Sequence, residues 1–107
     1  MSQPWSPAKA TRELRSYAMN PGFDLLWTGH VRERMAERDL ATGDILHILK
    51  FGVVFDEAEP ATRRGCFKYA MECTTPNSNG RAVRMICIPS PDQPAVKIVT
   101  IMWVDGK

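Results

Sequence analysis

A histidine and two arginines recur at every fourth position between residues 30 and 38, as His30, Arg34 and Arg38. In a helix this spacing places all three along the edge of the apolar face that Val31 and Met35 form. An arginine fork binds phosphate through paired hydrogen bonds, and histidine exchanges protons near neutral pH. Metal-free RNA cleavage needs a base for the 2′-hydroxyl, cations for the phosphate and an acid for the leaving oxygen. One interpretation of these residues, here named the histidine–arginine stripe, is therefore an RNA-cleaving site.

The same stripe has a structural interpretation. The stems of Arg34 and Arg38 can cover the core while their charged ends pair with nearby acidic residues such as Glu37, Asp39 or Asp44. His30 can then serve only as a hydrogen-bonding partner of a neighbouring element. The residues alone leave both interpretations open.

Further candidate residues follow the stripe along the chain. Arg63, Arg64 and Lys68 form the densest basic cluster, which either holds a nucleic-acid backbone or balances the preceding acidic residues. Those acidic residues are Asp56, Glu57 and Glu59. Two strand aromatics, Tyr69 and Trp103, either stack on bases or belong to the core. Arg81 and Arg84 point to opposite faces of one strand, so at most one of them joins a given patch.

Hydrophobic periodicity predicts an α+β fold in a single domain, with helices packed on one side of a small, twisted antiparallel sheet. The expected elements are a helix at about 7–19, a strand at about 23–28, helices at about 29–39 and 43–51, and antiparallel strands at about 53–58, 66–74, 81–88 and 96–104. Ser6, Thr28 and Thr42 are expected N-caps. Gly52 is expected to end the third helix, and the sequence PNSNG at 76–80 predicts a hairpin turn.

Composition narrows the function classes. The 107 residues carry a net charge of +2, and each half of the chain has seven Lys or Arg against six Asp or Glu. A nucleic-acid contact must therefore come from a local patch. Three cysteines without a CxxC pair favour reduced thiols over a disulfide framework or a zinc site, and we expect no metal and no cofactor. No secretory signal or membrane-spanning run is evident, so a cytoplasmic location is expected.

The residues also resemble a known family. The run from Trp27-Thr-Gly-His30 through Arg34-Met-Ala-Glu-Arg-Asp-Leu40, followed by Asp44-Ile45, Leu49, Gly52-Val-Val54 and the late Lys97–Trp103 segment, resembles domain-of-unknown-function family 4258. The resemblance covers about residues 10–104, and HxxxRMxxRxL is its most specific part. That family is placed beside the RelE/ParE-like toxins and is similar to the BrnT branch.

The resemblance implies a RelE-like fold and a type II toxin-like, metal-independent endoribonuclease (an mRNA interferase) of a bacterial toxin–antitoxin system. It also implies two partners: RNA, free or on the ribosome, and a small antitoxin protein. The expected catalytic residues are His30, Arg34, Arg38 and Lys68, and the expected RNA-binding residues are Arg63, Arg64, Tyr69, Arg84 and Trp103.

Besides the endoribonuclease, the sequence leaves a second and a third alternative open. RelE-like toxins tend to be clearly basic, whereas this chain is nearly neutral, which favours a non-catalytic module on the same fold that binds a protein or nucleic acid. A homodimer formed by edge-to-edge pairing of the sheet is the third alternative.

Overall fold

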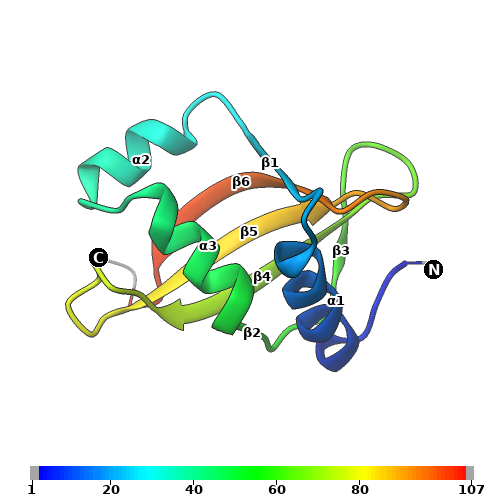
Figure 1. The fold of residues 1–107 in the computed structure, drawn as a ribbon, viewed down its shortest axis with the longest axis horizontal. Coiled ribbons are helices and arrows are strands. Elements are labelled where there is room, and N and C mark those ends of the chain that lie inside the picture. Colours follow the sequence, from blue (N-terminus) through cyan, green and yellow to red (C-terminus); the bar gives the residue numbers. More distant parts are fainter. Residues whose placement is uncertain (1–2, 106–107) are drawn as a thin grey trace.

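A computed structural model describes residues 3–105 (Figure 1). Along the chain the elements are α1 (Pro7–Met19), β1 (Asp24–Trp27), α2 (Val31–Glu37), α3 (Thr42–Phe51), β2 (Val53–Val54), β3 (Glu59–Pro60), β4 (Phe67–Thr74), β5 (Ala82–Pro89) and β6 (Ala95–Trp103). The architecture is α+β, as the periodicity predicted.

The strands form one sheet in the order β1-β6-β5-β4-β2, and β3 pairs with β4 beyond the end of β2. All pairs are antiparallel except β1 with β6, which is parallel. The expectation of a wholly antiparallel sheet was therefore wrong at this edge. β1 and β6 lie at opposite ends of the chain, so no tight hairpin between them imposes an antiparallel direction.

The helices cover one face of the sheet, with α1 and α3 lying over the same side (Figure 1). Alternate residues of the long strands point into this layer: Tyr69, Met71, Val83, Met85 and Cys87 are all buried. The intervening residues, among them Lys68, Ala70, Arg84 and Ile86, point to the opposite face. None of the three described helices lies over that face, which we call the open face.

Local signals explain where the helices begin and end. The Ser6 hydroxyl accepts a hydrogen bond from the Lys9 amide at 3.3 Å, and Pro7 occupies the first helical position. Gly52 ends α3 as expected, with its amide donating to the Ile48 carbonyl at 2.7 Å. A Cβ at Gly52 would lie 2.5 Å from that carbonyl oxygen, so the close approach requires glycine.

Two expected caps were wrong. His30 occupies the N-cap position of α2 without a side-chain cap, and the Thr28 hydroxyl instead donates to the Val99 carbonyl at 2.9 Å. Ala41 occupies the N-cap position of α3, and the Asp44 carboxylate accepts from its amide at 2.7 Å. At α2, Thr28 forms a tertiary hydrogen bond instead of capping the helix. At α3, the side chain that pairs with the first backbone amide is Asp44, not Thr42.

The strand expected at 53–58 is interrupted. Val54 pairs with Met71 and Glu59 pairs with Lys68, so residues 55–58 stand opposite only residues 69 and 70. The two extra residues force the chain to bulge out of the sheet. This bulge divides the predicted strand into β2 and β3 and places its acidic residues beside the open face.

Candidate functional site

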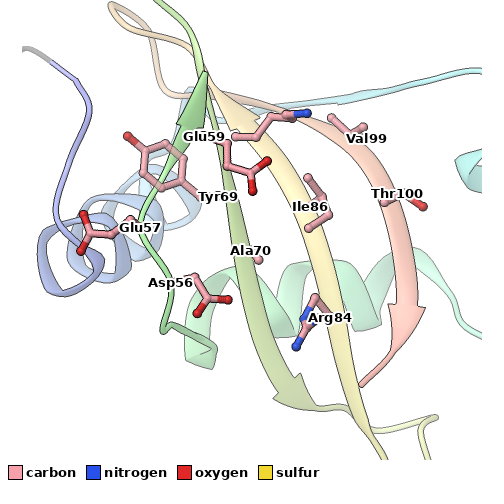
Figure 2. A pocket seen from close by; sticks show the side chains of 10 residues that line it. Asp56, Glu57, Glu59, Tyr69, Ala70, Arg84, Ile86, Val99 and Thr100 are labelled. Carbon is pink, nitrogen blue, oxygen red and sulfur yellow. The ribbon is translucent and has the colours of Figure 1, made fainter. Parts of the chain in front are cut away.

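A shallow cavity of about 350 Å³ opens on the open face and extends across β4, β5 and β6 (Figure 2). Its lining residues are Asp56, Glu57, Glu59, Lys68, Tyr69, Ala70, Arg84, Ile86, Val99 and Thr100. We call this cavity the sheet pocket. The three strands, and the bulged segment before β3, each contribute polar side chains to it.

The floor of the sheet pocket is apolar because of residue size and strand geometry. Ala70 in β4 has a small side chain beside Ile86 of β5, its partner in register, and this leaves room above the sheet. A β-bulge lies between Ile86 and Cys87, whose partners on β6 are Thr100 and Ile98. Val99 is therefore the extra residue of β6, and it forms one end of the floor.

Two cations from adjacent strands enter the sheet pocket. Arg84 is paired, because its Nε and Nη2 lie 2.8 and 2.7 Å from Glu72 Oε2 across the β4–β5 ladder. Lys68 makes no ion pair or hydrogen bond through its ammonium group with any residue between 3 and 105. Lys68 is thus the cation whose charge is available to a bound anion.

Carboxylates form the opposite rim. Glu59 stands directly across from Lys68 in the β3–β4 pair, and opposed residues of an antiparallel pair point to the same face. Asp56 and Glu57 come from the bulge and are exposed (Figure 2). The sheet pocket therefore combines three acidic and two basic side chains over an apolar floor.

The structure places the histidine–arginine stripe elsewhere. His30 and Arg34 are exposed, while Arg38 is half-buried and donates from Nη1 to the Arg34 carbonyl at 3.2 Å. Arg38 also lies 3.6 Å from the Glu37 carboxylate, which is the pairing that the structural interpretation foresaw. None of the three residues lines the sheet pocket. The expected grouping of the stripe with Lys68 is therefore not formed.

The stripe nevertheless begins close to one end of the sheet pocket. The hydrogen bond from the Thr28 hydroxyl joins the segment before α2 to Val99, a residue of the pocket floor. α2 packs against β6 through Val31 and Met35, both buried. The stripe is thus positioned beyond the β6 side of the pocket.

The expected RNA-binding residues divide into different environments. Arg63 and Arg64 are exposed in the turn before β4 and do not line the sheet pocket, whereas Arg84 does. Trp103 is half-buried under the Arg81 guanidinium, whose carbon is 4.0 Å from the centre of the ring system. Of these four residues, only Arg84 lines the sheet pocket together with Lys68.

The expectation that Tyr69 stacks on a base does not agree with its burial. Its side chain has 2% exposure and its ring stacks on Trp5 with centroids 5.5 Å apart. The Tyr69 hydroxyl accepts from the Trp5 amide at 2.9 Å and donates to Gln3 Oε1 at 3.0 Å. Burial raises the pKa of Tyr69, which further suits a neutral core phenol.

The acidic rim was not predicted to be part of a site. Asp56, Glu57 and Glu59 were interpreted only as counter-charges to the basic cluster, and Thr100 was not singled out. The available signal was the acidic run at 56–59, which directly precedes a basic run at 63–68. Without the pairing of Glu59 with Lys68, that signal does not show that both charges share one pocket.

Metal-binding and thiol chemistry are not evident at this site. Between residues 3 and 105, no three His, Cys, Asp or Glu side chains come together in an arrangement that would hold a metal ion. Cys66, Cys73 and Cys87 are free thiols, and burial raises the pKa of Cys87 to about 12. Cys87 is consequently protonated and unreactive at neutral pH.

Comparison with known proteins assigns the chain to a family. The family model described as a domain of unknown function, DUF4258, matches residues 27–103, which is well over half of the 107 residues. The chain belongs to this family, and the family resemblance expected from the sequence is confirmed. No curated protein and no solved structure matches the chain. Within residues 3–105, no helix combines the length and apolar character needed to cross a bilayer.

Proposed function

We propose that the protein is a toxin-like endoribonuclease that cleaves RNA bound over the open face, with the sheet pocket as its reaction site. The observation that carries the proposal is the placement of Glu59, Lys68 and Arg84 in one pocket on three adjacent strands. A mostly antiparallel sheet that is open on one side and covered by helices on the other supports the proposal of a RelE-like fold. The family resemblance adds the toxin class and an antitoxin as partner.

The chemistry follows from these side chains. Glu59 accepts the proton of the ribose 2′-hydroxyl, whose oxygen attacks the adjacent phosphorus. Lys68, with Arg84 beside it, stabilises the negative charge that develops on the phosphate oxygens. The bond from phosphorus to the 5′-oxygen breaks, and that oxygen takes a proton from the Lys68 ammonium or from water. The products are a 2′,3′-cyclic phosphate and a 5′-hydroxyl, and the residues of the pocket supply the proton transfers.

In this proposal the histidine–arginine stripe binds the RNA backbone beyond the pocket. Arg34 is exposed and α2 contacts β6, so an RNA chain that extends from the sheet pocket across β6 approaches the stripe. Arginine binds phosphate at any physiological pH. The stripe thus contributes to binding, and the proton transfers belong to the sheet pocket.

Growth and cleavage assays with variants test this assignment. We expect expression of the wild type to arrest bacterial growth, and purified protein to cleave RNA with or without ribosomes. Glu59→Gln and Lys68→Met each remove one reacting group at nearly constant size, so we expect cleavage to fall by about 10²-fold or more. Lys50→Met and Glu33→Gln are matched controls, because both residues are exposed on helices and lie outside the pocket.

The triple variant His30→Ala/Arg34→Ala/Arg38→Ala separates the pocket from the stripe. We expect it to weaken RNA binding while its cleavage rate at saturating RNA stays close to the wild-type rate. Loss of that rate in the triple variant, with Lys68→Met still active, would move the reaction site to α2. If cells that express the full-length protein grow normally and the purified protein cleaves no RNA, the proposal that it is an endoribonuclease is wrong.

A second candidate function is a non-catalytic module that binds a partner through the open face. It is favoured by the charge of the sheet pocket, because Glu72 already pairs with Arg84 and three more carboxylates line the pocket with Lys68. Such a surface repels phosphate and suits a partner with basic groups. This candidate predicts no cleavage, together with a specific partner whose binding is lost when Asp56 and Glu57 are changed to lysine.

A further inference from the structure

A second cavity, of about 340 Å³, lies between α1 and the segment that joins β5 to β6. Trp5 and Tyr17 supply aromatic walls, with ring planes at 88° and centroids 5.9 Å apart. Gln93 and Pro94 of the joining segment form part of the other side. We call this cavity the α1 cavity. It shares no lining residue with the sheet pocket.

The two sides of the α1 cavity are held together in the free protein. The Tyr17 hydroxyl donates to the Ser90 carbonyl at 2.7 Å, which joins α1 to the β5–β6 segment. The Ser90 hydroxyl and Asp92 Oδ1 lie 3.0 Å apart, which shapes the turn at that point. The cavity is therefore built before any ligand arrives, which lowers the cost of binding.

The charged residues that line this cavity are both acidic. Glu13 comes from α1 and Asp92 from the joining segment, and no Lys or Arg is found among the described residues that line the cavity. Burial, and then the negative charges of Glu13 and Asp92, raise the pKa of Tyr17, so both carboxylates lie near its phenol. Neither carboxylate forms an ion pair within residues 3–105.

Trp5 provides an independent observation. Its side chain has 3% exposure, and its indole Nε1 is buried without a hydrogen-bond partner in the described part of the chain. A buried donor of this kind is uncommon in a protein that is otherwise well paired. Trp5 is also part of the cavity wall. Its Nε1 has almost no accessible surface in the free protein, so this donor gains a partner only if the ring turns toward an occupant of the cavity.

We propose that the α1 cavity binds an arginine side chain presented by a segment of a partner polypeptide. A guanidinium group stacks on aromatic faces and forms forked hydrogen bonds to carboxylates, so it suits Tyr17, Glu13 and Asp92. If the Trp5 ring turns toward the bound segment, a peptide carbonyl beside the arginine accepts from its indole N–H. This site is separate from the proposed reaction site, so the proposal of arginine binding does not depend on RNA cleavage.

Titration of the ¹⁵N-labelled full chain with the peptide acetyl-Gly-Arg-Gly-amide tests the site. The chain has three tryptophans, and their indole signals can be assigned with Trp27→Phe and Trp103→Phe. We expect saturable shifts of the Trp5 indole signal and of amides in the Ser90–Pro94 segment. Glu13→Gln/Asp92→Asn should weaken binding at least about tenfold, as expected for the loss of a charge-assisted hydrogen bond.

Matched controls separate this site from general attraction to acidic surfaces. Asp56→Asn/Glu57→Gln removes two carboxylates from the sheet pocket, and we expect it to leave the peptide affinity unchanged. The same peptide with neutral citrulline in place of arginine should bind at least about tenfold more weakly. The spectra of each variant also report whether it is folded.

Three outcomes would overturn the proposal: no shift of the Trp5 signal, equal weakening by the two double variants, or equal binding of the citrulline peptide. Methylguanidinium distinguishes the two sources of the same chemistry. If methylguanidinium binds as tightly as the peptide, the cavity is a site for a small free cation, and the proposal of a partner polypeptide is wrong.

Discussion

Asp44 shows how one side chain connects two elements. It has 1% exposure and accepts hydrogen bonds from the Ala41 amide at 2.7 Å and from the Asn77 amide and Nδ2 at 3.0 and 2.9 Å. Burial alone would raise the pKa of Asp44, but these hydrogen bonds to the charged form outweigh it, so the pKa is lowered. The ionised carboxylate thus holds the start of α3 against the β4–β5 turn.

Substitution of Asp44 should therefore be costly and should change the response to acid. We expect Asp44→Ala to lower the free energy of unfolding by about 3 kcal/mol, because buried amides lose a charged acceptor. Since the folded pKa lies below the unfolded value of about 4, the carboxylate stabilises the protein fully above that pH, and the effect is lost as the pH falls through the folded pKa. Urea unfolding from pH 7 to pH 2 measures both effects. A wild type and an Asp44→Asn variant that lose stability in parallel below pH 4 would contradict this account.

The candidate site also shows what residue type alone can predict. Lys68 was expected as part of a basic cluster and Arg84 as a basic strand residue, and both reach the sheet pocket. Tyr69 was expected either to stack on a base or to belong to the core, and it belongs to the core. The alternation of β4 shows that Lys68 and Tyr69 face opposite ways, but it does not show which face the helices cover.

At the scale of elements, the junction of α1, α3 and β2 depends on backbone groups at the end of α3. Arg15 donates from Nε and Nη2 to the Gly52 carbonyl at 3.2 and 3.0 Å, and from Nη2 to the Phe51 carbonyl at 3.2 Å. The Thr11 hydroxyl accepts from the Val54 amide at 2.9 Å. These contacts pair the carbonyls that the helix leaves unsatisfied and cover the outer edge of β2.

Glycine at position 52 is required by this junction, and Gly43 in the first turn of α3 serves as a control. We expect Gly52→Ala to lower stability by about 2 kcal/mol, because its Cβ would meet the Ile48 and Glu72 carbonyl oxygens at 2.5 and 3.2 Å. A Cβ at Gly43 meets nothing within 4 Å, so Gly43→Ala should raise stability by up to about 1 kcal/mol. Chemical denaturation of the two variants compares them directly, and equal effects would show that the close approach at Gly52 is unimportant.

At the scale of the whole molecule, an aromatic cluster joins the first described residues to the sheet. Trp5 stacks on Tyr69 of β4 and meets Tyr17 of α1 edge-on. Residues 3–26, which include α1, precede the region that the family model matches. This segment is nevertheless part of the common core, because Trp5, Ala10 and Leu14 are buried within it.

The cluster should therefore contribute to global stability. We expect Trp5→Ala to lower the free energy of unfolding by about 4 kcal/mol through loss of buried aromatic surface. Tyr69→Phe keeps the ring and removes only the hydroxyl that pairs with Trp5 and Gln3, so a loss of about 1 kcal/mol is expected. Calorimetry on both variants measures the difference. A Trp5→Ala variant as stable as the wild type would mean that the segment before α1 is dispensable for the core.

The sequence alone determined where several helices and strands begin and end, because those signals are local. Ser6-Pro7, Gly52 and the turn at 76–80 act through bonds within a few residues, and the change from a helical period to alternation at Val53 marks where the strands begin. Membership of the family could also be predicted from the sequence, since it depends on the residue types themselves. Tertiary structure alone decided the parallel pairing of β1 with β6, the bulge that places Asp56 and Glu57 at the sheet pocket, and the separation of the stripe from Lys68. Each of these depends on contacts between residues far apart in the chain, and no local pattern of residue types specifies which distant segments become neighbours.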